Sequence, residues 1–371
     1  MGNRFATRAL VVSRAFTRRS MPTTAPREIS RILVAHNLLL GDTLMLTPLL
    51  AKLRALHPAA DIVLLAAPAY VPLYASRPYG VRALPFRPAD VSTTHALLDE
   101  APFELALVLG DNRYSWLAAA LGAEHIVAHG GDAPWTKDWF VDEKRAYALQ
   151  PAAWGDMAAD LVDGPAPRPF ARGDWQAPAA RDFELPEAPY AVLHVGASTL
   201  LKQWRPERWM ELATVLEARG LRPVWSAGRA EEPLVEAIDP ARRFGSFAGK
   251  LDLAQLWRLV AQASLLVAPD TGVAHLGRVT WTPTVTLFGP GSAILCGPGS
   301  FWRDSRWAAV GEEEFPCRDQ KMLFRREVEW VRRCTRTTRE CAEPRCMHAI
   351  AVSTVVAAVD RLMEPRLPEL P

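Results

Sequence analysis

The stretch RILVAHNLLLGDTLMLTPLLAKLRALHPAADIVLLA, residues 31–66, decides the fold class. Arg31–His36 is a short apolar run of the kind that forms a buried strand. Thr43–Leu56 carries apolar residues at helical spacing and ends at a His-Pro dipeptide, which stops a helix. Asp61–Ala66 is a second apolar run. Strand, helix and strand in this order predict a parallel sheet with helices on its faces.

The same alternation continues along the chain. In the first half, further strands are predicted at Val81–Leu84, Leu105–Leu109 and His125–Ala128. A helix is predicted there at Tyr114–Leu121. In the second half, strands are predicted at Tyr190–His194, Pro223–Ser226, Leu265–Ala268 and Thr284–Phe288. Helices are predicted there at Pro206–Arg219, Leu253–Ala263, Gly272–Val279 and Val352–Met363. The fold class is therefore α/β, with two doubly wound, Rossmann-like domains in tandem.

A weak pattern between residues 130 and 189 marks the connection between these domains. We expect a basic and flexible N-terminal extension over 1–29, a first domain over 30–175 and a second over 176–350. The last segment, 351–371, is expected to be a helix and tail that pack back on the first domain. Since ligands bind outside the carboxyl ends of the strands in such folds, the cleft between the domains is the expected site.

Composition excludes several classes of protein. The chain has 371 residues, of which 49% are hydrophobic and 23% charged, so it can bury a core and is not disordered. A net charge of +2 argues against a dedicated nucleic-acid-binding protein. No apolar run reaches the length of a membrane-spanning helix. Five cysteines are too few for a secreted disulfide scaffold.

The first 30 residues are basic, with six arginines against one acid, Glu28. The apolar stretch Leu10–Val12 is too short for a secretory signal and is followed by more arginine. Two interpretations stay open. One is a frayed tail, or a gene start placed too early with Met21 as the true first residue. The other is a basic amphipathic anchor lying on an anionic membrane surface.

The turn after the first strand excludes two nucleotide-binding motifs. His36–Asp42 holds one glycine, so it lacks the Gly-x-Gly-x-x-Gly of a dinucleotide site, and no P-loop motif occurs in the chain. Asp42 lies near the start of the following helix. It is interpreted either as an N-cap or as a carboxylate that faces the cleft and accepts a proton.

Two turns in the second domain suit a phosphate. HVGASTLLKQWRPERW (His194–Trp209) leaves a strand, passes hydroxyl residues and enters a helix, and LLVAPDTGVAHLG (Leu265–Gly277) does the same. Backbone N–H groups at helix starts and a lysine bind diphosphates without a divalent metal. The structural alternatives are capping residues, a surface lysine and a core histidine. The candidate residues are Ser198, Thr199, Lys202, Asp270, Thr271, Gly272 and His275.

Taken in order, these segments resemble glycosyltransferase family 9, the lipopolysaccharide heptosyltransferases. The resemblance rests on the Gly-Asp turn with Thr47–Ile62, on HVGAS and KQWRPERWMELA, on Phe247–Gly277 with Pro283–Pro290, and on Cys346–Ile350. It spans roughly residues 30–363. It implies the GT-B architecture, with the acceptor on the N-terminal domain and the nucleotide sugar on the C-terminal domain. It also implies transfer with inversion and without metal or another cofactor.

The resemblance assigns a role to each candidate. Asp42 would be the general base, and Ser198, Thr199 and Lys202 would contact the pyrophosphate. The remaining donor contacts fall on Asp270, Thr271, Gly272 and His275 for phosphates and sugar hydroxyls, on Glu232 (with Glu231 second) for the ribose, and on Leu251 for the adenine. The family often carries a basic residue where this chain has Asn37 and leucines.

The implied partners are a nucleotide-sugar donor, first of all ADP-heptose, and a lipid-linked or lipopolysaccharide-core acceptor. No nucleic acid is expected. The implied location is the cytoplasm, with peripheral contact on the cytoplasmic face of the inner membrane as one alternative. Two competing functions are a transferase of the same fold that uses another nucleotide sugar, and a catalytically silent binding or scaffold protein. The presence of Asp42, Lys202 and Asp270 argues against the silent protein.

Four cysteines cluster near the C-terminus, with Cys296 apart from them. Their spacing, C-x16-C-x6-C-x4-C, lacks the close pairs of a zinc ribbon. A disulfide pair, four thiols and a metal knot are the alternatives for Cys317, Cys334, Cys341 and Cys346. The basic residues around them are interpreted as a solvated face or as contacts for acceptor phosphates; they are Arg318, Lys321, Arg325, Arg326, Arg332, Arg333, Arg336 and Arg339.

Overall fold

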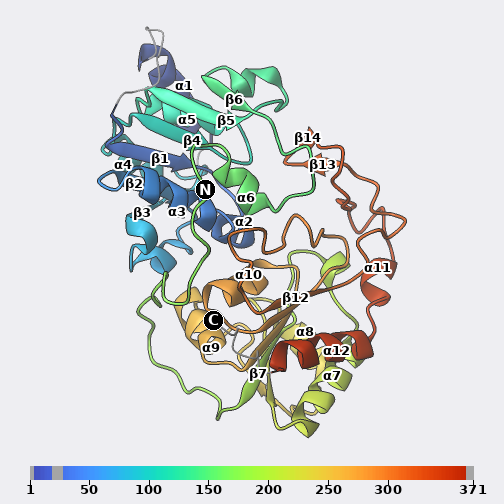
Figure 1. The fold of residues 1–371 in the computed structure, drawn as a ribbon. Coiled ribbons are helices and arrows are strands. Elements are labelled where there is room, and N and C mark those ends of the chain that lie inside the picture. The colour runs from blue at the N-terminus through green and yellow to red at the C-terminus, as the bar shows by residue number, and fades with distance from the viewer. Residues whose placement is uncertain (1–3, 19–27, 365–371) are drawn as a thin grey trace, which may run out of the picture. The chain divides into compact units, whose positions relative to one another are not determined.

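The computed structural model describes residues 4–18 and 28–364, which form two compact units (Figure 1). The first unit comprises the chain up to Ala179 together with Gly299–Phe301 and Lys321–Val331. The second comprises Ala180–Pro298, Trp302–Gln320 and the chain from Arg332 onward. The chain therefore leaves the first unit near the predicted boundary and returns to it twice, which the sequence pattern does not show.

The first unit is built on a parallel sheet. Within the described residues its strand order is β3 (Val81–Pro85), β2 (Asp61–Ala66), β1 (Arg31–Ala35), β4 (Leu105–Val108), β5 (His125–His129) and β6 (Glu143–Arg145). Its α-helices are α1 (Arg4–Arg18), α2 (Leu40–Leu44), α3 (Thr47–Leu56), α4 (Val91–Leu98), α5 (Tyr114–Ala120) and α6 (Trp154–Ala159). Short 3-10 helices lie at η1 (Val71–Tyr74), η2 (Pro78–Gly80) and η3 (Trp135–Asp138), and the returning segment 321–331 adds the hairpin β13 (Met322–Leu323) and β14 (Arg326–Glu327).

The second unit repeats this plan. Its parallel strands follow the order β12 (Trp307–Val310), β11 (Thr284–Leu287), β10 (Leu265–Pro269), β7 (Tyr190–His194), β8 (Arg222–Ser226) and β9 (Gly245–Ser246). Its helices are α7 (Pro206–Ala218), α8 (Glu232–Ile238), α9 (Leu253–Ala261), α10 (Gly272–Val279), α11 (Arg345–His348) and α12 (Val352–Met363), with the 3-10 helix η4 (Leu200–Lys202). The fold class predicted from the sequence is confirmed.

In each sheet, the order in which successive strands are added changes direction between two neighbouring central strands. In the first sheet β1 pairs with β4, and in the second β7 pairs with β10, each time in parallel. At such a switch point the loops after the two strands separate toward opposite faces of the sheet. The gap outside the carboxyl ends is where α/β proteins bind ligands. The loops after β1, β4, β7 and β10 are therefore the places to look for function.

The C-terminal helix α12 belongs to the second unit, which corrects the expectation that it packs back on the first domain. It contacts α7, β11 and β12. Val352, Val355 and Val359 are buried in the core of the second unit. Their spacing of three and four residues forms one apolar stripe, and this stripe finds its partner in the sheet that precedes it in the chain.

Part of the N-terminal extension is ordered, contrary to the expected flexible extension. The helix α1 contacts α4 and α5, and Ala15 is buried in the core of the first unit. The candidate start Met21 lies outside the described residues. Within the ranges 4–18 and 28–364, no helix combines the length and apolar composition needed to cross a membrane.

Two smaller differences concern element boundaries. The helix predicted over Thr43–Leu56 is two helices, α2 and α3, because Pro48 starts a new helix at its second position. The sequence pattern also misses the short strands β6 and β12 at the outer edges of the sheets. Edge strands are exposed on one side, so their apolar pattern is weak.

Candidate functional site

Lys202, which is partly buried, and Asp270, which is buried, form an ion pair at the switch point of the second sheet. Lys202 lies in the loop after β7, and Asp270 directly follows β10. The Nζ of Lys202 donates to Asp270 Oδ2 at 2.8 Å and to the backbone oxygen of Asp270 at 2.7 Å. Since β7 and β10 are parallel neighbours, the two predicted turns meet at one edge of the sheet. The structure therefore brings together the lysine and the aspartate that the sequence selects.

Both members of this pair are charged. Burial alone would favour the neutral form of each group, but their mutual attraction outweighs it. Despite burial, the Lys202 ammonium holds the pKa of Asp270 below its usual value, and the Asp270 carboxylate holds the pKa of Lys202 above its own. The ion pair is thus maintained across the physiological pH range.

Further positive charge surrounds the pair. Arg333 is close enough to oppose the charge on Lys202, and Arg278 is close enough to act on Asp270 and His275. The guanidinium of Arg278 is buried, which lowers its pKa to about 10, and it donates to the backbone oxygen of Gly297 at 2.9 Å. Three cations and one carboxylate give this corner a net positive charge, which favours an anionic ligand.

Two polar atoms at the start of α10 are buried without a partner. Thr271 is the N-cap residue of α10, but its side chain accepts no capping hydrogen bond. Within the described chain, Thr271 Oγ1 and His275 Nδ1 have no hydrogen-bond partner. Burial, followed by the charge of Arg278, lowers the pKa of His275 to about 3, so the imidazole is neutral. Buried polar atoms without a partner in the protein are available to a bound ligand or to water.

Gly272 begins α10, so the first backbone N–H groups of this helix lie beside those two orphaned atoms. The N–H of Ala274 donates to the backbone oxygen of Thr271 at 3.1 Å, while the N–H groups of Gly272 and Val273 come too early in the helix for an acceptor within it. Together with the helix dipole they attract an anion. Capping and core packing, the structural alternatives for Thr271 and His275, therefore do not account for their side chains.

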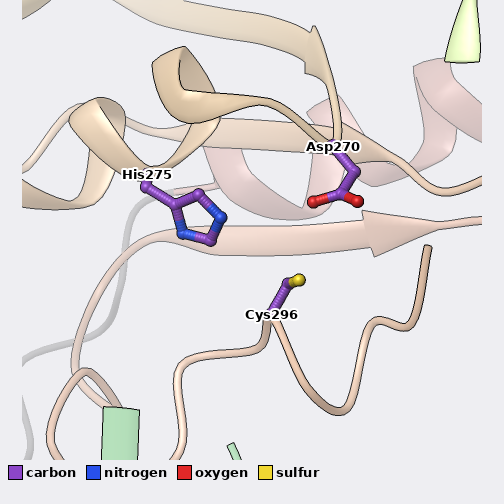
Figure 2. A group of neighbouring side chains, drawn as sticks. All are labelled: Asp270, His275 and Cys296. Carbon is purple, nitrogen blue, oxygen red and sulfur yellow. The ribbon is translucent and has the colours of Figure 1, made fainter. Parts of the chain in front are cut away.

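Cys296 completes a cluster with Asp270 and His275 (Figure 2). The three side chains point toward one another from separate segments, and their candidate ligand atoms lie within 4.8 Å of one another. That spacing would suit a metal ion. The ammonium of Lys202, however, already lies 2.8 Å from Asp270 Oδ2, where it would repel a metal cation.

Sequence reasoning set Cys296 apart from the other four cysteines and gave it no role. One signal could have found it, because Cys296 lies in the segment after β11, which is the parallel neighbour of β10. The loops after neighbouring parallel strands share one edge of the sheet.

Ser198 and Thr199 lie on the loop that carries Lys202. The Oγ1 of Thr199 accepts from the backbone N–H of Leu201 at 3.3 Å, and Ser198 is exposed. Glu231 braces the same loop, since its carboxylate accepts from the backbone N–H of Ala197 at 3.1 Å. The loop is thus held in place while its hydroxyl groups remain near the surface.

Glu232 and Leu251 lie near each other in the folded second unit. Glu232 is exposed at the start of α8, and its carboxylate lies against Gly249, where an added Cβ would come within 1.9 Å of Oε1. Leu251 is half-buried two residues further on. Because the carboxylate of Glu231 is bonded to backbone, Glu232 is the acidic side chain that stays available at this corner.

Asp42 lies in the first turn of α2 in the first unit. The N-cap interpretation of Asp42 is wrong, because α2 begins at Leu40 and its N-cap residue is Leu39. The Asp42 side chain is half-buried, and its charge adds to the effect of burial in raising the pKa of Tyr70. Helix capping therefore does not explain the presence of this carboxylate.

A cavity of about 290 Å³ opens at the switch point of the first sheet. It lies outside the carboxyl ends of β1, β4 and β5. At Gly110 the backbone has a φ of +78°, and a Cβ there would approach Leu38 to 2.6 Å, so glycine is required. The cavity is lined by Asn37, Leu38, Leu109, Gly110, Asp111, Arg113, Tyr114, Asp132, Phe324 and Arg325.

The hairpin β13–β14 supplies one side of this cavity. Its two turn residues, Phe324 and Arg325, both have positive φ, at 45° and 66°. Such a turn favours Asn-Gly, so two bulky residues here carry strain that the surrounding structure must hold. Strained turns of this kind are concentrated at functional sites.

Arg326 anchors the hairpin. Its buried guanidinium donates to the backbone oxygen of Gly110 at 2.8 Å and to Asn112 Oδ1 at 2.7 Å, and it lies 3.5 Å from the carboxylate of Asp132. Arg325, by contrast, is exposed and lines the cavity. Sequence reasoning treated these arginines as one basic stretch, because the contact joins segments some two hundred residues apart.

The C-terminal cysteines are thiols, as are all five cysteines of the described chain. The metal-type cluster in the described residues is that of Asp270, His275 and Cys296, and it does not include the other four. Their basic neighbours differ in role. Arg318 is buried and donates to the backbone oxygens of Phe288 and Gly289, so a solvated face does not describe the whole stretch.

Two Rossmann-like units in tandem form the GT-B architecture, which is a fold of glycosyltransferases. The chain belongs to one family of this class: the model of glycosyltransferase family 9 (heptosyltransferase) matches residues 94–324. It is thus a glycosyltransferase, as the resemblance predicts.

Two relatives illustrate the similarity in sequence. Lipopolysaccharide heptosyltransferase 3 of Escherichia coli is 24% identical over 358 residues, covering 87% of this chain and 96% of that protein. Lipopolysaccharide heptosyltransferase 1 of Pseudomonas aeruginosa is 27% identical over 234 residues, which cover 59% of this chain and 62% of that protein.

Solved structures show the same fold. A family 9 glycosyltransferase of Veillonella parvula aligns with a TM-score of 0.70 at 17% identity, over 92% of this chain and 99% of that one. ADP-heptose lipopolysaccharide heptosyltransferase II of E. coli aligns with a TM-score of 0.66 at 17% identity, over 90% and 98%.

Proposed function

We propose that this protein transfers a heptose from ADP-heptose to an acceptor of the lipopolysaccharide core, with inversion and without a metal ion. The observation that supports the proposal most strongly is the corner around Lys202 and Asp270, where net positive charge, orphaned polar atoms and a helix start meet. Each of these features suits a diphosphate. Proteins of the same fold bind such donors: an E. coli heptosyltransferase was solved with ADP-2-deoxy-2-fluoro heptose.

The proposed reaction is a single displacement. Asp42 accepts the proton of an acceptor hydroxyl while that oxygen forms a bond to the anomeric carbon of the donor sugar. The bond from this carbon to the diphosphate oxygen breaks, and the electron pair leaves with the nucleoside diphosphate. One displacement inverts the anomeric centre. Lys202 and the N-terminus of α10 stabilise the charge on the departing diphosphate.

Six other candidate residues supply the remaining contacts to the donor. Ser198 and Thr199 offer hydroxyl groups to the diphosphate, and Thr271 and His275 offer their unpartnered atoms to phosphate or sugar oxygens. Glu232 accepts from the ribose hydroxyls, and Leu251 packs beside the adenine.

The acceptor binds the first unit in the cavity beside the hairpin β13–β14, where Arg325 holds an anionic group. Replacing Arg325 with alanine is expected to raise the acceptor KM about tenfold, because hydrogen bonds to charged groups contribute about 1.5–3 kcal/mol. The donor KM should not change. Arg172→Ala, an exposed arginine of the same unit, is the control. Equal acceptor KM values for the R325A and R172A proteins would contradict this assignment.

Metal independence is a separate prediction. Because Lys202 pairs with the carboxylate that a metal would need, turnover should be unchanged after dialysis against EDTA. Metal analysis of the dialysed protein should find less than one ion per chain. Loss of activity in EDTA that zinc or manganese restores would show that Asp270, His275 and Cys296 hold a catalytic ion.

A panel of nucleotide sugars separates the competing functions. A ligand present at 100 times its Kd stabilises the folded state by about 2.7 kcal/mol, so the true donor should raise the melting temperature by several degrees. ADP-heptose is expected to give the largest shift. A larger shift with another nucleotide sugar would favour a transferase with a different donor. Binding without acceptor-dependent release of nucleoside diphosphate would favour the silent protein.

A lipid-linked acceptor places the reaction at the cytoplasmic face of the inner membrane. We therefore propose that the protein works in the cytoplasm as a peripheral partner of that membrane.

A further inference from the structure

A group of large apolar side chains is exposed on the first unit, on α1 and η3. Trp135 is 71% exposed, Trp139 is 52% exposed and Phe16 is 53% exposed. Phe5 and Val12 are exposed as well. We call these five residues the aromatic patch. Single exposed apolar residues are ordinary, but a contiguous group of this size marks an interaction surface.

Ring contacts show that the patch is continuous. The rings of Trp135 and Trp139 stack with centroids 5.5 Å apart, and Phe16 meets Trp139 edge-on at 6.2 Å. Phe5, Val12 and Phe16 are seven and four residues apart, which places them on one side of α1. The opposite side of α1, with Thr7 and Ala15, is buried against the unit.

The charge around the patch is positive. Arg8, three residues after Phe5 and four before Val12, is exposed on the same side of α1 as these side chains, and α1 contains no acidic residue. The one acid of η3, Asp138, is buried and accepts from Asn112 Nδ2 at 2.6 Å. Exposed tryptophan rings beside arginines suit the interface of an anionic bilayer, where the ring enters the headgroup region and the cation meets lipid phosphates.

The patch is also tied to the acceptor cavity. Lys137 lies between the two tryptophans in sequence, and its Nζ pairs at 3.1 Å with both Asp111 and Asp132. Both of these acids line the cavity. One short helix therefore presents tryptophans outward and supports the wall of the cavity inward.

From these contacts we infer that the aromatic patch and Arg8 dock the protein on an anionic lipid surface, beside the cavity that takes the acceptor. The lipid contact itself does not depend on the proposed function. Its purpose does, since a bilayer at this place would deliver a lipid-linked acceptor directly to the cavity.

Vesicle flotation with the full chain tests this inference. The wild-type protein is expected to float with vesicles of phosphatidylcholine and phosphatidylglycerol (7:3) and to remain in solution with phosphatidylcholine alone. Trp135→Ser with Trp139→Ser should reduce the partition coefficient about tenfold or more, since both rings lose their burial in lipid. Arg8→Gln should reduce it about fivefold and weaken its salt dependence.

Leu149→Ser is the matched control, because this leucine is 87% exposed on the same unit and lies outside the patch. Thermal unfolding of each variant shows that it is folded. Equal flotation of the W135S/W139S and L149S proteins would overturn the inference, and so would lipid-free self-association of the wild type that the tryptophan variant abolishes. Because flotation uses neither donor nor acceptor, an inactive protein that still floats would refute only the proposed function.

Discussion

Replacing Asp42 with asparagine is expected to lower kcat by about 10²–10⁴-fold, the usual loss when a general base is removed. Asparagine has nearly the same shape but does not accept the proton of the acceptor hydroxyl. Thermal unfolding of the D42N protein checks that the variant is folded. The donor KM should be unchanged, because Asp42 acts on the acceptor.

The measurement is acceptor-dependent release of nucleoside diphosphate at saturating donor and acceptor. Asp99→Asn, an exposed acid of the same unit, serves as control and should retain full activity. Turnover of the D42N protein within about threefold of wild type would show that another group takes the proton.

Replacing Lys202 with methionine is expected to lower kcat by about 10²–10³-fold, the loss typical of one donor removed from a transition-state charge. Donor affinity should fall as well, since the cation is in place before the bond breaks. The change also leaves Asp270 buried without its partner, which should cost about 3–5 kcal/mol of unfolding free energy.

A second variant separates these two effects. Lys202→Met combined with Asp270→Asn removes the uncompensated carboxylate and should recover much of the unfolding free energy, while kcat stays low. Urea unfolding and steady-state kinetics on both proteins give the two quantities. Recovery of turnover together with stability would mean that Lys202 serves the fold and not the diphosphate.

Most of the fold could be predicted from the sequence because the central strands of both sheets are parallel and buried. Asp61–Ala66 and Tyr190–His194, for example, are apolar except at Asp61 and His194, and they match β2 and β7 at both ends. The position of α12 could not be predicted in the same way. Its valine stripe indicates a buried face but does not say which sheet covers it.

Only some residues of the candidate site could be predicted from the sequence. Lys202 and Asp270 could be predicted because each lies between a strand and the α-helix that follows it, and parallel neighbours bring such loops together. Cys296 and Arg326 depend on long-range contacts. The side chain of Arg326 meets Gly110 and Asn112 from more than two hundred positions away, and no local pattern in the sequence records that contact.

A transfer assay with ADP-heptose and a deacylated lipopolysaccharide-core acceptor tests the proposed inverting heptose transfer directly. Product is read by mass spectrometry and by the configuration of the new anomeric carbon. We expect one ADP to be released for each heptose added, with the anomeric configuration of the donor inverted. A product that retains the donor configuration, or the absence of ADP release by a protein that binds both substrates, would contradict it.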